Sequence, residues 1–201
     1  MYSKSKQLGS RSKVKKKLRK DKKKATRTAK PALMPLSKLD RFVWDITSLA
    51  FRVEDADKMG QVKCCTCGKS MYYYKSDAQL GHFISRRVKN TKFLRKNLAT
   101  QDTACNIYRY GEQFKFSKFL DKKYGEGTAE EMYELSNCTT KFTRWDYKKV
   151  LLENSKTLLE QSKIKNLYDW KQGLAKWKLH FLDNLSTYTE DSTIMLGRYR
   201  T

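Results

Sequence analysis

Apolar residues recur at helical spacing in the stretch that follows Pro35 in this 201-residue chain. Their intervals of three and four residues predict an amphipathic helix over about 38–54. The apolar positions are Leu39, Phe42, Val43, Ile46, Leu49, Ala50 and Val53. Ser37 and Asp40 have the spacing of a capping box at the start of this helix. The apolar stripe is most simply explained as one face of a hydrophobic core.

The middle of the chain shows strand patterns instead. Aromatic and β-branched residues are frequent over 71–74 and 80–84, which predicts two short strands. The polar and basic stretch 85–96 predicts a loop, and Asp102 is a good N-cap for a helix that starts near Thr103. Short strands combined with separate helices predict the fold class α+β.

The second half of the chain is expected to be helical. An apolar pattern continues over 114–120 up to Gly125, and capping-box-like sequences begin at Thr128 and Thr143. A heptad-like stripe interrupted by Gly173 follows. It consists of Leu167, Trp170, Leu174, Trp177 and Phe181. This stripe either packs against the same chain or forms the seam of a homodimer.

The charge of the chain is extreme, because 44 Lys and Arg residues against 21 Asp and Glu residues give a net charge of +23. Such a field attracts polyanions, of which nucleic acid ranks first and an anionic membrane surface second. No apolar run reaches the roughly 18 residues needed to span a bilayer, and no signal-peptide pattern is present. We therefore expect a cytoplasmic protein that binds DNA and does not enter membranes.

Much of this charge lies near the N-terminus, where residues 1–31 hold 14 Lys and Arg residues against one acid, a local charge of +13. Self-repulsion and a lack of apolar residues predict a disordered tail and linker over 1–36. A domain over 37–165 and a helical extension over 166–201 are expected to follow. The tail either binds DNA or acts as a localisation signal, and both roles are compatible. Its expected DNA contacts are Lys15, Lys16, Lys17, Arg19, Lys20, Lys22, Lys23 and Lys24.

The cysteine spacing indicates a metal site. Three of the five cysteines fall within four positions, which in a reducing compartment suggests metal ligation before disulfides. Cys64 and Cys67 form a Cys-x-x-Cys turn that points two sulfurs the same way. Structural zinc sites usually need a second pair, which here is Asp102-x-x-Cys105. Asp102 is either a zinc ligand or a plain helix N-cap, and the two roles can overlap.

Two further cysteines and two histidines remain. Cys65 is expected to be a buried or spare thiol, and Cys138 a core residue. His82 lies where a strand runs into the basic loop, whereas His180 lies in the Trp-rich stripe. A histidine can activate a water molecule, and a divalent cation can neutralise charge on a scissile phosphate. Taken alone, a single histidine on a strand is more often structural.

The surrounding motifs change this interpretation. A Gly-His-Phe-x-Ser-Arg motif at 81–86, Asn97, and a Gln-x-x-x-Cys-Asn motif at 101–106 occur in this order. Together they resemble the HNH nucleases, which have a ββα-metal core. More narrowly, residues 22–165 resemble the phage NinG/Rap recombination endonucleases. The resemblance implies a zinc-stabilised ββα-metal core flanked by helices. It also implies metal-dependent hydrolysis of phosphodiester bonds in branched DNA such as Holliday junctions and D-loops.

The resemblance also assigns roles to particular residues. His82 would be the general base that activates water, and Asn97 would fix the loop around it. Asn106 would bind a catalytic Mg²⁺ or Mn²⁺ ion through its amide oxygen. Arg86 and Arg87 would contact phosphates near the cut; the alternative for both is a solvated loop.

The chain departs from the family pattern in several places. Asp102 replaces one cysteine of the second pair. Gly81 stands where other HNH enzymes carry a metal-binding Asp, which leaves the second ligand of the catalytic cation open. Asp77 and Gln79 are the nearest candidates, although Asp77 is also a plausible turn residue. Arg95 stands where family members commonly have an acid, and is expected to add positive charge close to the phosphate.

These departures keep other functions open. One is a non-enzymatic, zinc-stabilised DNA-binding protein that assists recombination. Such a protein would bind DNA with steep salt dependence but would not cut it. Another is an HNH homing endonuclease with a specific duplex site, which ranks third because the chain shows no separate base-reading module.

Overall fold

A computed structural model describes residues 16–17 and 34–184, and those from Pro35 onward belong to one compact unit. This unit combines helices with two two-stranded sheets, as the predicted α+β class requires. Among the described residues, no helix is both long and apolar enough to cross a bilayer. The elements are α2 (Leu36–Asp55), β1 (Gln61–Lys63), β2 (Ser70–Tyr72), β3 (Ala78–His82), η1 (Arg95–Asn97), β4 (Leu98–Asp102), η2 (Ala104–Tyr108), α3 (Gln113–Tyr124), α4 (Thr128–Ser136), α5 (Arg144–Lys165), η3 (Asp169–Gly173) and α6 (Lys176–Asp183).

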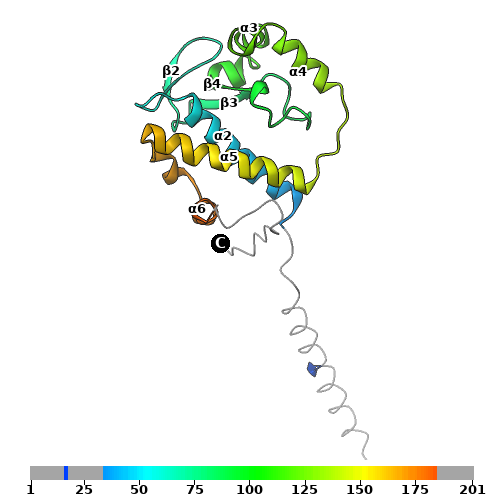
Figure 1. Cartoon of the computed structure of the whole chain (residues 1–201), viewed down its shortest axis with the longest axis vertical. Coiled ribbons are helices and arrows are strands. Elements are labelled where there is room, and N and C mark those ends of the chain that lie inside the picture. Colours follow the sequence, from blue (N-terminus) through cyan, green and yellow to red (C-terminus); the bar gives the residue numbers. More distant parts are fainter. Residues whose placement is uncertain (1–15, 18–33, 185–201) are drawn as a thin grey trace, which may run out of the picture. The chain divides into compact units, whose positions relative to one another are not determined.

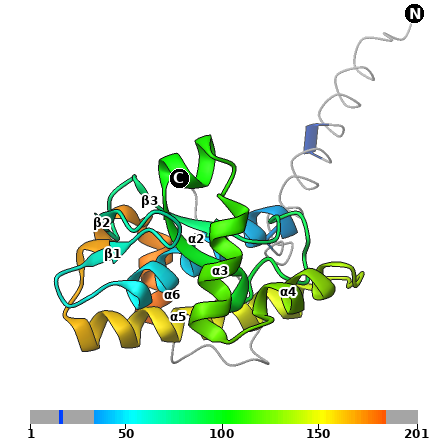
Figure 2. The same ribbon diagram turned by 90° about the horizontal axis from the view of Figure 1, so that it is seen from above.

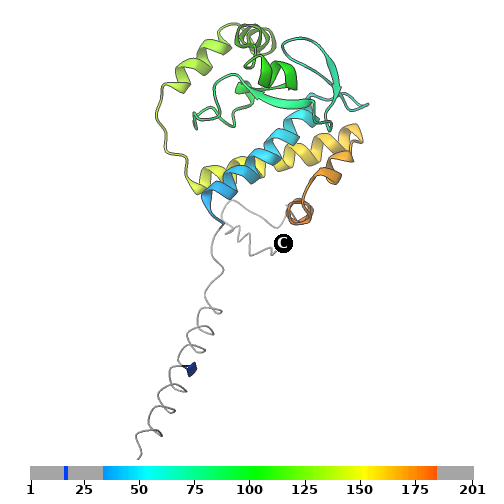
Figure 3. The same cartoon turned by 180° about the vertical axis from the view of Figure 1, so that it is seen from behind.

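Helices α2 and α5 lie side by side and form the base of the unit (Figures 1 and 3). The predicted stripe of α2 is buried, because it packs against α5 on one side and the strands on the other. A buried hydrogen bond from Asn154 Nδ2 to Thr47 Oγ1, 2.8 Å long, joins the two helices inside this apolar contact. The helix predicted over 38–54 is therefore confirmed.

The predicted capping box of α2 is wrong, because the helix begins directly after Pro35 without a side-chain cap. Asp40 has another task. Its carboxylate accepts hydrogen bonds from Lys92 Nζ at 2.6 Å, Lys89 Nζ at 3.0 Å and the Tyr147 hydroxyl at 2.8 Å. Burial would raise the pKa of Asp40, but these donors outweigh it and lower the pKa. Asp40 thus ties the loop at 85–96 and α5 to α2.

Two antiparallel hairpins cover α2. Strands β1 and β2 pair with Val62 opposite Met71, and β3 and β4 pair with Gly81 opposite Ala99. Figure 2 shows β1 and β2 at one end of the unit and α4 at the other. Arg52 of α2 donates to the carbonyl oxygens of Tyr73 at 2.6 Å and Ala78 at 3.0 Å, which anchors the connection between the hairpins.

The sequence pattern located two strands and missed their partners. The strand expected over 71–74 is β2, and the one expected over 80–84 is β3, shifted two residues toward the N-terminus. Strand β1 has only three residues, and all five residues of β4 are buried. A strand buried on both faces lacks the apolar–polar alternation that marks a strand in sequence.

The C-terminal stripe packs within the chain. Leu167 and Trp170 are buried, and the ring of Phe181 meets the Phe42 ring edge-on, with 5.4 Å between centroids. The side chain of Trp177 lies outside the described residues. The homodimer seam and the boundaries predicted at 36 and 165 stay predictions.

The capping boxes of the second half have different outcomes. Thr143 caps α5 with Asp146 in a complete box, as predicted. The cap of α4 is Gly127, one residue earlier than expected, because Thr128 instead donates to the Gly125 carbonyl at 2.7 Å.

The contact between α2 and α5 predicts a stability effect. Leu158→Ala should lower the free energy of unfolding by about 2–5 kcal/mol, because Leu158 is fully buried and truncation leaves a cavity. Ile164→Ala on the exposed face of the same helix is the matched control and should cost well under that amount. Urea unfolding of the zinc-loaded protein measures both, and equal losses would contradict this packing.

Candidate functional site

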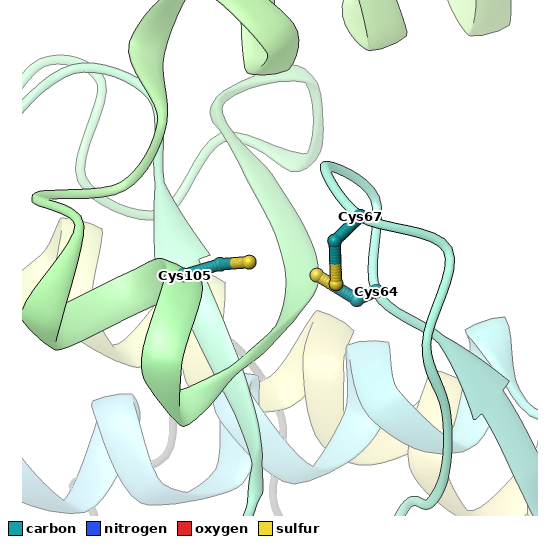
Figure 4. A group of neighbouring side chains, drawn as sticks. All are labelled: Cys64, Cys67 and Cys105. Carbon is teal, nitrogen blue, oxygen red and sulfur yellow. The ribbon is translucent and has the colours of Figure 1, made fainter.

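Three cysteine thiols converge on one point. Cys64 follows β1, Cys67 lies in the next turn, and Cys105 lies in η2, with the three sulfurs within 4.8 Å of one another (Figure 4). Tetrahedral zinc with Zn–S bonds of about 2.3 Å places its sulfurs about 3.8 Å apart. Gly68, with a φ of +76°, closes the turn by donating its N–H to the Cys64 carbonyl at 2.9 Å. This cluster can hold a metal ion such as zinc, as the spacing predicted.

The pKa values of two thiols in the cluster are shifted in opposite directions. Burial would raise the pKa of Cys64, but hydrogen bonds from the Thr66 side chain and from nearby backbone N–H groups lower it to about 7. For Cys105, burial and the neighbouring thiols raise the pKa to about 11. The Thr66 hydroxyl lies 3.3 Å from the Cys64 sulfur. Three thiolates this close repel one another, so full ionisation requires a bound cation.

The other two cysteines stand apart from this cluster. Cys65 packs against Ala99, Phe116 and Leu120, and burial together with the nearby Cys64 charge raises its pKa strongly. It is a half-buried spare thiol, as expected. Cys138 is exposed, so its prediction as a core residue is wrong.

The structure does not bring Asp102 into the thiol cluster. One carboxylate oxygen lies 2.7 Å from Lys69 Nζ, and the other accepts the Ala104 N–H at 3.1 Å, at the start of η2. These contacts occupy the carboxylate outside the cluster, so among the described residues three sulfurs would hold a zinc ion and leave its fourth position to another ligand. Asp77 also lies beside Lys69, 3.8 Å from its Nζ, and is not among the residues lining the cleft at His82.

Asn97 holds the loop before β4. It is fully buried, its Oδ1 accepts the Ile84 N–H at 2.6 Å, and its Nδ2 donates to the carbonyls of Ile84 at 3.0 Å and Thr91 at 2.9 Å. All three amide positions are therefore used to clamp the two ends of the loop. This is the positioning role that the resemblance implies.

His82 sits at the end of β3, beneath that loop. Its Nε2 lies 3.2 Å from the Lys92 carbonyl oxygen, and its ring stacks on Trp44 with centroids 4.6 Å apart. A carbonyl can only accept, so Nε2 carries the hydrogen in the neutral ring and Nδ1 keeps its lone pair. Burial, opposed by the Lys92 carbonyl and assisted by the charges of Lys92 and Arg86, lowers the pKa of His82 to about 4.

His82 opens into a cleft of about 730 Å³. Asn106 lines the same cleft, and its Nδ2 donates to Gln79 Oε1 at 2.7 Å. Arg86 is exposed at the rim, and Arg87 is exposed next to it. The cleft therefore joins a neutral imidazole, amide groups and a guanidinium.

Some expected contributions lie elsewhere. Arg95 binds the carboxylates of Glu54 and Asp55, which compensate its charge, and its role near the phosphate stays a prediction. Lys16 and Lys17 are exposed, and the other tail residues expected on DNA lie outside the described residues. Trp44 was missed, because it lies beside the apolar stripe of its helix and no motif marks it.

A comparison with protein families places the chain in one of them. A family model described as Bacteriophage Lambda NinG protein matches residues 1–167, so the chain belongs to the NinG family. The family supports a function related to phage recombination. No curated protein and no solved structure matches the chain.

The thiol cluster predicts a zinc requirement. Cys105→Ser should lower the zinc content from about one ion per chain to near zero, because two thiols alone hold zinc weakly. Cys138→Ser, which changes an exposed cysteine outside the cluster, should keep the full content. Elemental analysis of purified protein measures both variants, and zinc retained in Cys105→Ser would contradict the cluster as the metal site.

Asp102→Asn tests the fourth position in the same assay. The full zinc content is expected, and a loss of zinc would make Asp102 a ligand.

The environment of His82 predicts its titration. The ring proton signals of His82, assigned by comparison with His82→Ala, should shift with a midpoint at about pH 4 in the zinc-loaded protein. Because the folded pKa lies below the ordinary value of 6.5, the ring stays neutral through the physiological range. A midpoint near 6.5 in the NMR titration would show that the ring is not desolvated as described.

Proposed function

We propose that this protein is a metal-dependent endonuclease that cleaves branched DNA by phosphodiester hydrolysis. One observation carries the proposal: a neutral histidine with an available Nδ1 faces a cleft that also contains Asn106. The order of β3, β4 and η2, with His82 on the first strand and Asn106 on the helix, supports a ββα-metal core. A neutral imidazole keeps the ring lone pair with which a general base accepts a proton.

In this proposal each residue has a separate task. His82 takes a proton from the attacking water at Nδ1, while the Lys92 carbonyl and the Trp44 ring hold the imidazole in place. Asn97 keeps the loop above it in one conformation. Arg86 contacts a phosphate beside the scissile bond. A divalent cation, Mg²⁺ or Mn²⁺, would bind at Asn106 and supply charge neutralisation at the scissile phosphate.

The two metal sites are linked through η2. Cys105 and Asn106 are adjacent, so a zinc ion on the three thiols would fix the position of the neighbouring amide. The basic chain, with a net charge of +23, supplies nonspecific affinity for the DNA backbone. The preference for branched over duplex DNA rests on the family resemblance.

Replacing each of the two histidines in turn tests whether His82 acts as the general base. His82→Ala should lower the rate of cleavage of a four-way junction at least about 100-fold in Mg²⁺ or Mn²⁺, because it removes the general base. Affinity for the same junction should stay unchanged. His180→Ala, which changes an exposed histidine on α6, should cleave at the wild-type rate.

The outcomes separate the candidate functions. Retained cleavage by His82→Ala would remove this residue from the chemistry. Salt-sensitive binding by the wild type without any cutting of junction or duplex would establish the non-enzymatic DNA-binding alternative. Strong preference for one duplex sequence would indicate a homing-type endonuclease.

A further inference from the structure

Gln101 has a buried oxygen without a partner. The side chain is fully buried in β4, and its Oε1 has no hydrogen-bond partner among the described residues. Its Nε2 donates to the Gly111 carbonyl at 2.8 Å and to the Thr66 hydroxyl at 3.3 Å. Since a carbonyl can only accept, exchanging the two amide atoms would face oxygen against oxygen at Gly111. The orientation of the amide is therefore fixed, and a buried acceptor left unpaired costs about 1–3 kcal/mol.

This oxygen occupies the place of a missing side chain. A Cβ atom built on Gly81 would lie 2.0 Å from Gln101 Oε1 and 3.2 Å from Asn106 Oδ1. Gly81 does not have a positive φ, so its backbone accepts any residue, and a side chain is opposed by the Gln101 amide oxygen at 2.0 Å and less closely by Asn106 Oδ1 at 3.2 Å. Amide oxygens from β4 and η2 thus both lie within 3.2 Å of the position that a Gly81 Cβ would take, directly before His82.

Neither the Gln101 amide nor the Asn106 amide directs a hydrogen-bond donor toward the place that a Gly81 side chain would take. Asn106 directs its Nδ2 to Gln79, which turns its Oδ1 toward the point at Gly81. Both oxygens therefore lie close together beside the Gly81 Cα, and two acceptors this close repel unless a neighbouring cation or water is shared between them. Hard divalent cations take carboxylate, amide and carbonyl oxygens as ligands.

We propose that Gln101 is a ligand of the divalent cation that Asn106 binds, and that its Oε1 replaces the side chain absent at Gly81. The proposal rests on the proposed function for the cation, and it settles the second ligand differently from Asp77 or Gln79. Both protein ligands are neutral amides, so the free protein binds the cation less tightly than a carboxylate site does, and a DNA phosphate would complete the site.

The contacts also connect this ligand to the thiol cluster. Thr66 lies between the two, because its hydroxyl is 3.3 Å from the Cys64 sulfur and accepts the Gln101 Nε2 at 3.3 Å. A metal ion on the thiols therefore orients Gln101 through a single hydroxyl. Hydrogen-bonded partners of this kind hold metal ligands in position.

Binding of Mn²⁺ alone tests the proposal without any cleavage assay. Gln101→Met keeps the length of the side chain and removes the oxygen, and should weaken Mn²⁺ binding at least about tenfold. Gln161→Met, at a partly exposed glutamine of α5 that does not line the cleft, is the matched control and should bind like the wild type. Electron paramagnetic resonance of free Mn²⁺ in titrations of zinc-loaded protein measures the affinities, with zinc content and circular dichroism as fold controls.

A rescue variant covers the case in which Gln101→Met does not fold. Gly81→Asp combined with Gln101→Ala supplies a carboxylate in the space that the amide vacates, and should bind Mn²⁺ at least as tightly as the wild type. Gly81→Asp alone should bind Mn²⁺ more weakly than the double variant, because its Cβ would lie 2.0 Å from Gln101 Oε1 and the buried amide would have to move aside. Wild-type Mn²⁺ affinity in both Gln101→Met and Gly81→Asp would overturn the proposal, and the unpaired Gln101 oxygen would then be assigned to a water.

The readout separates this inference from the proposed function. A wild-type protein without a saturable Mn²⁺ site, or wild-type affinity in folded Gln101→Met, overturns Gln101 as a ligand even if junctions are cut. Mn²⁺ binding that depends on Gln101 supports the ligand even if no DNA substrate is cleaved, in which case only the endonuclease proposal fails.

Discussion

The convergence of three thiols is the constraint on which the rest of the site depends. Cys64 and Cys67 belong to a turn before β2, whereas Cys105 lies in η2, which follows β4 in the chain. Thiolates at this separation repel, so a cation that neutralises them would fasten the turn to η2 and close the chain between them. Asn106 follows directly in η2, and Gln101 reaches the same turn through Thr66. The positions of the cleft amides therefore depend on the cluster.

A second set of polar contacts holds the loop over His82. Asn97 clamps the loop from inside with its buried amide, and Asp40 holds it from α2 through Lys89 and Lys92. Lys92 then presents its carbonyl to the His82 imidazole. The tautomer of the histidine is thus set by a loop that is itself fixed from two sides. The same loop, together with Trp44, covers the His82 ring, and the resulting burial lowers the pKa of His82.

Much of the fold and the site could be predicted from local pattern. The stripe of α2, the box at Thr143 and the Cys64–Cys67 turn each depend on residues close in sequence, and each is confirmed. Strand β4 was missed because burial on both faces removes alternation. Asp102 fits a zinc ligand by spacing alone, but Lys69 and the Ala104 N–H satisfy its carboxylate. The carboxylate partners of Arg95, Glu54 and Asp55, could not be predicted because they lie on α2, distant in sequence.

The sequence by itself determined the class of the chain: a basic α+β protein with a cysteine metal site and a family membership carried by ordered motifs. Charge, periodicity and spacing are properties of the chain alone and survive in any conformation. Only the tertiary structure decided which amide oxygens lie close together in the cation site that we propose. The approach of Gln101 to Asn106 over the bare Cα of Gly81 depends on the register of β3 with β4 and on the placement of η2. Pairing across strands and packing between elements fix such distances, and neither is written in local sequence.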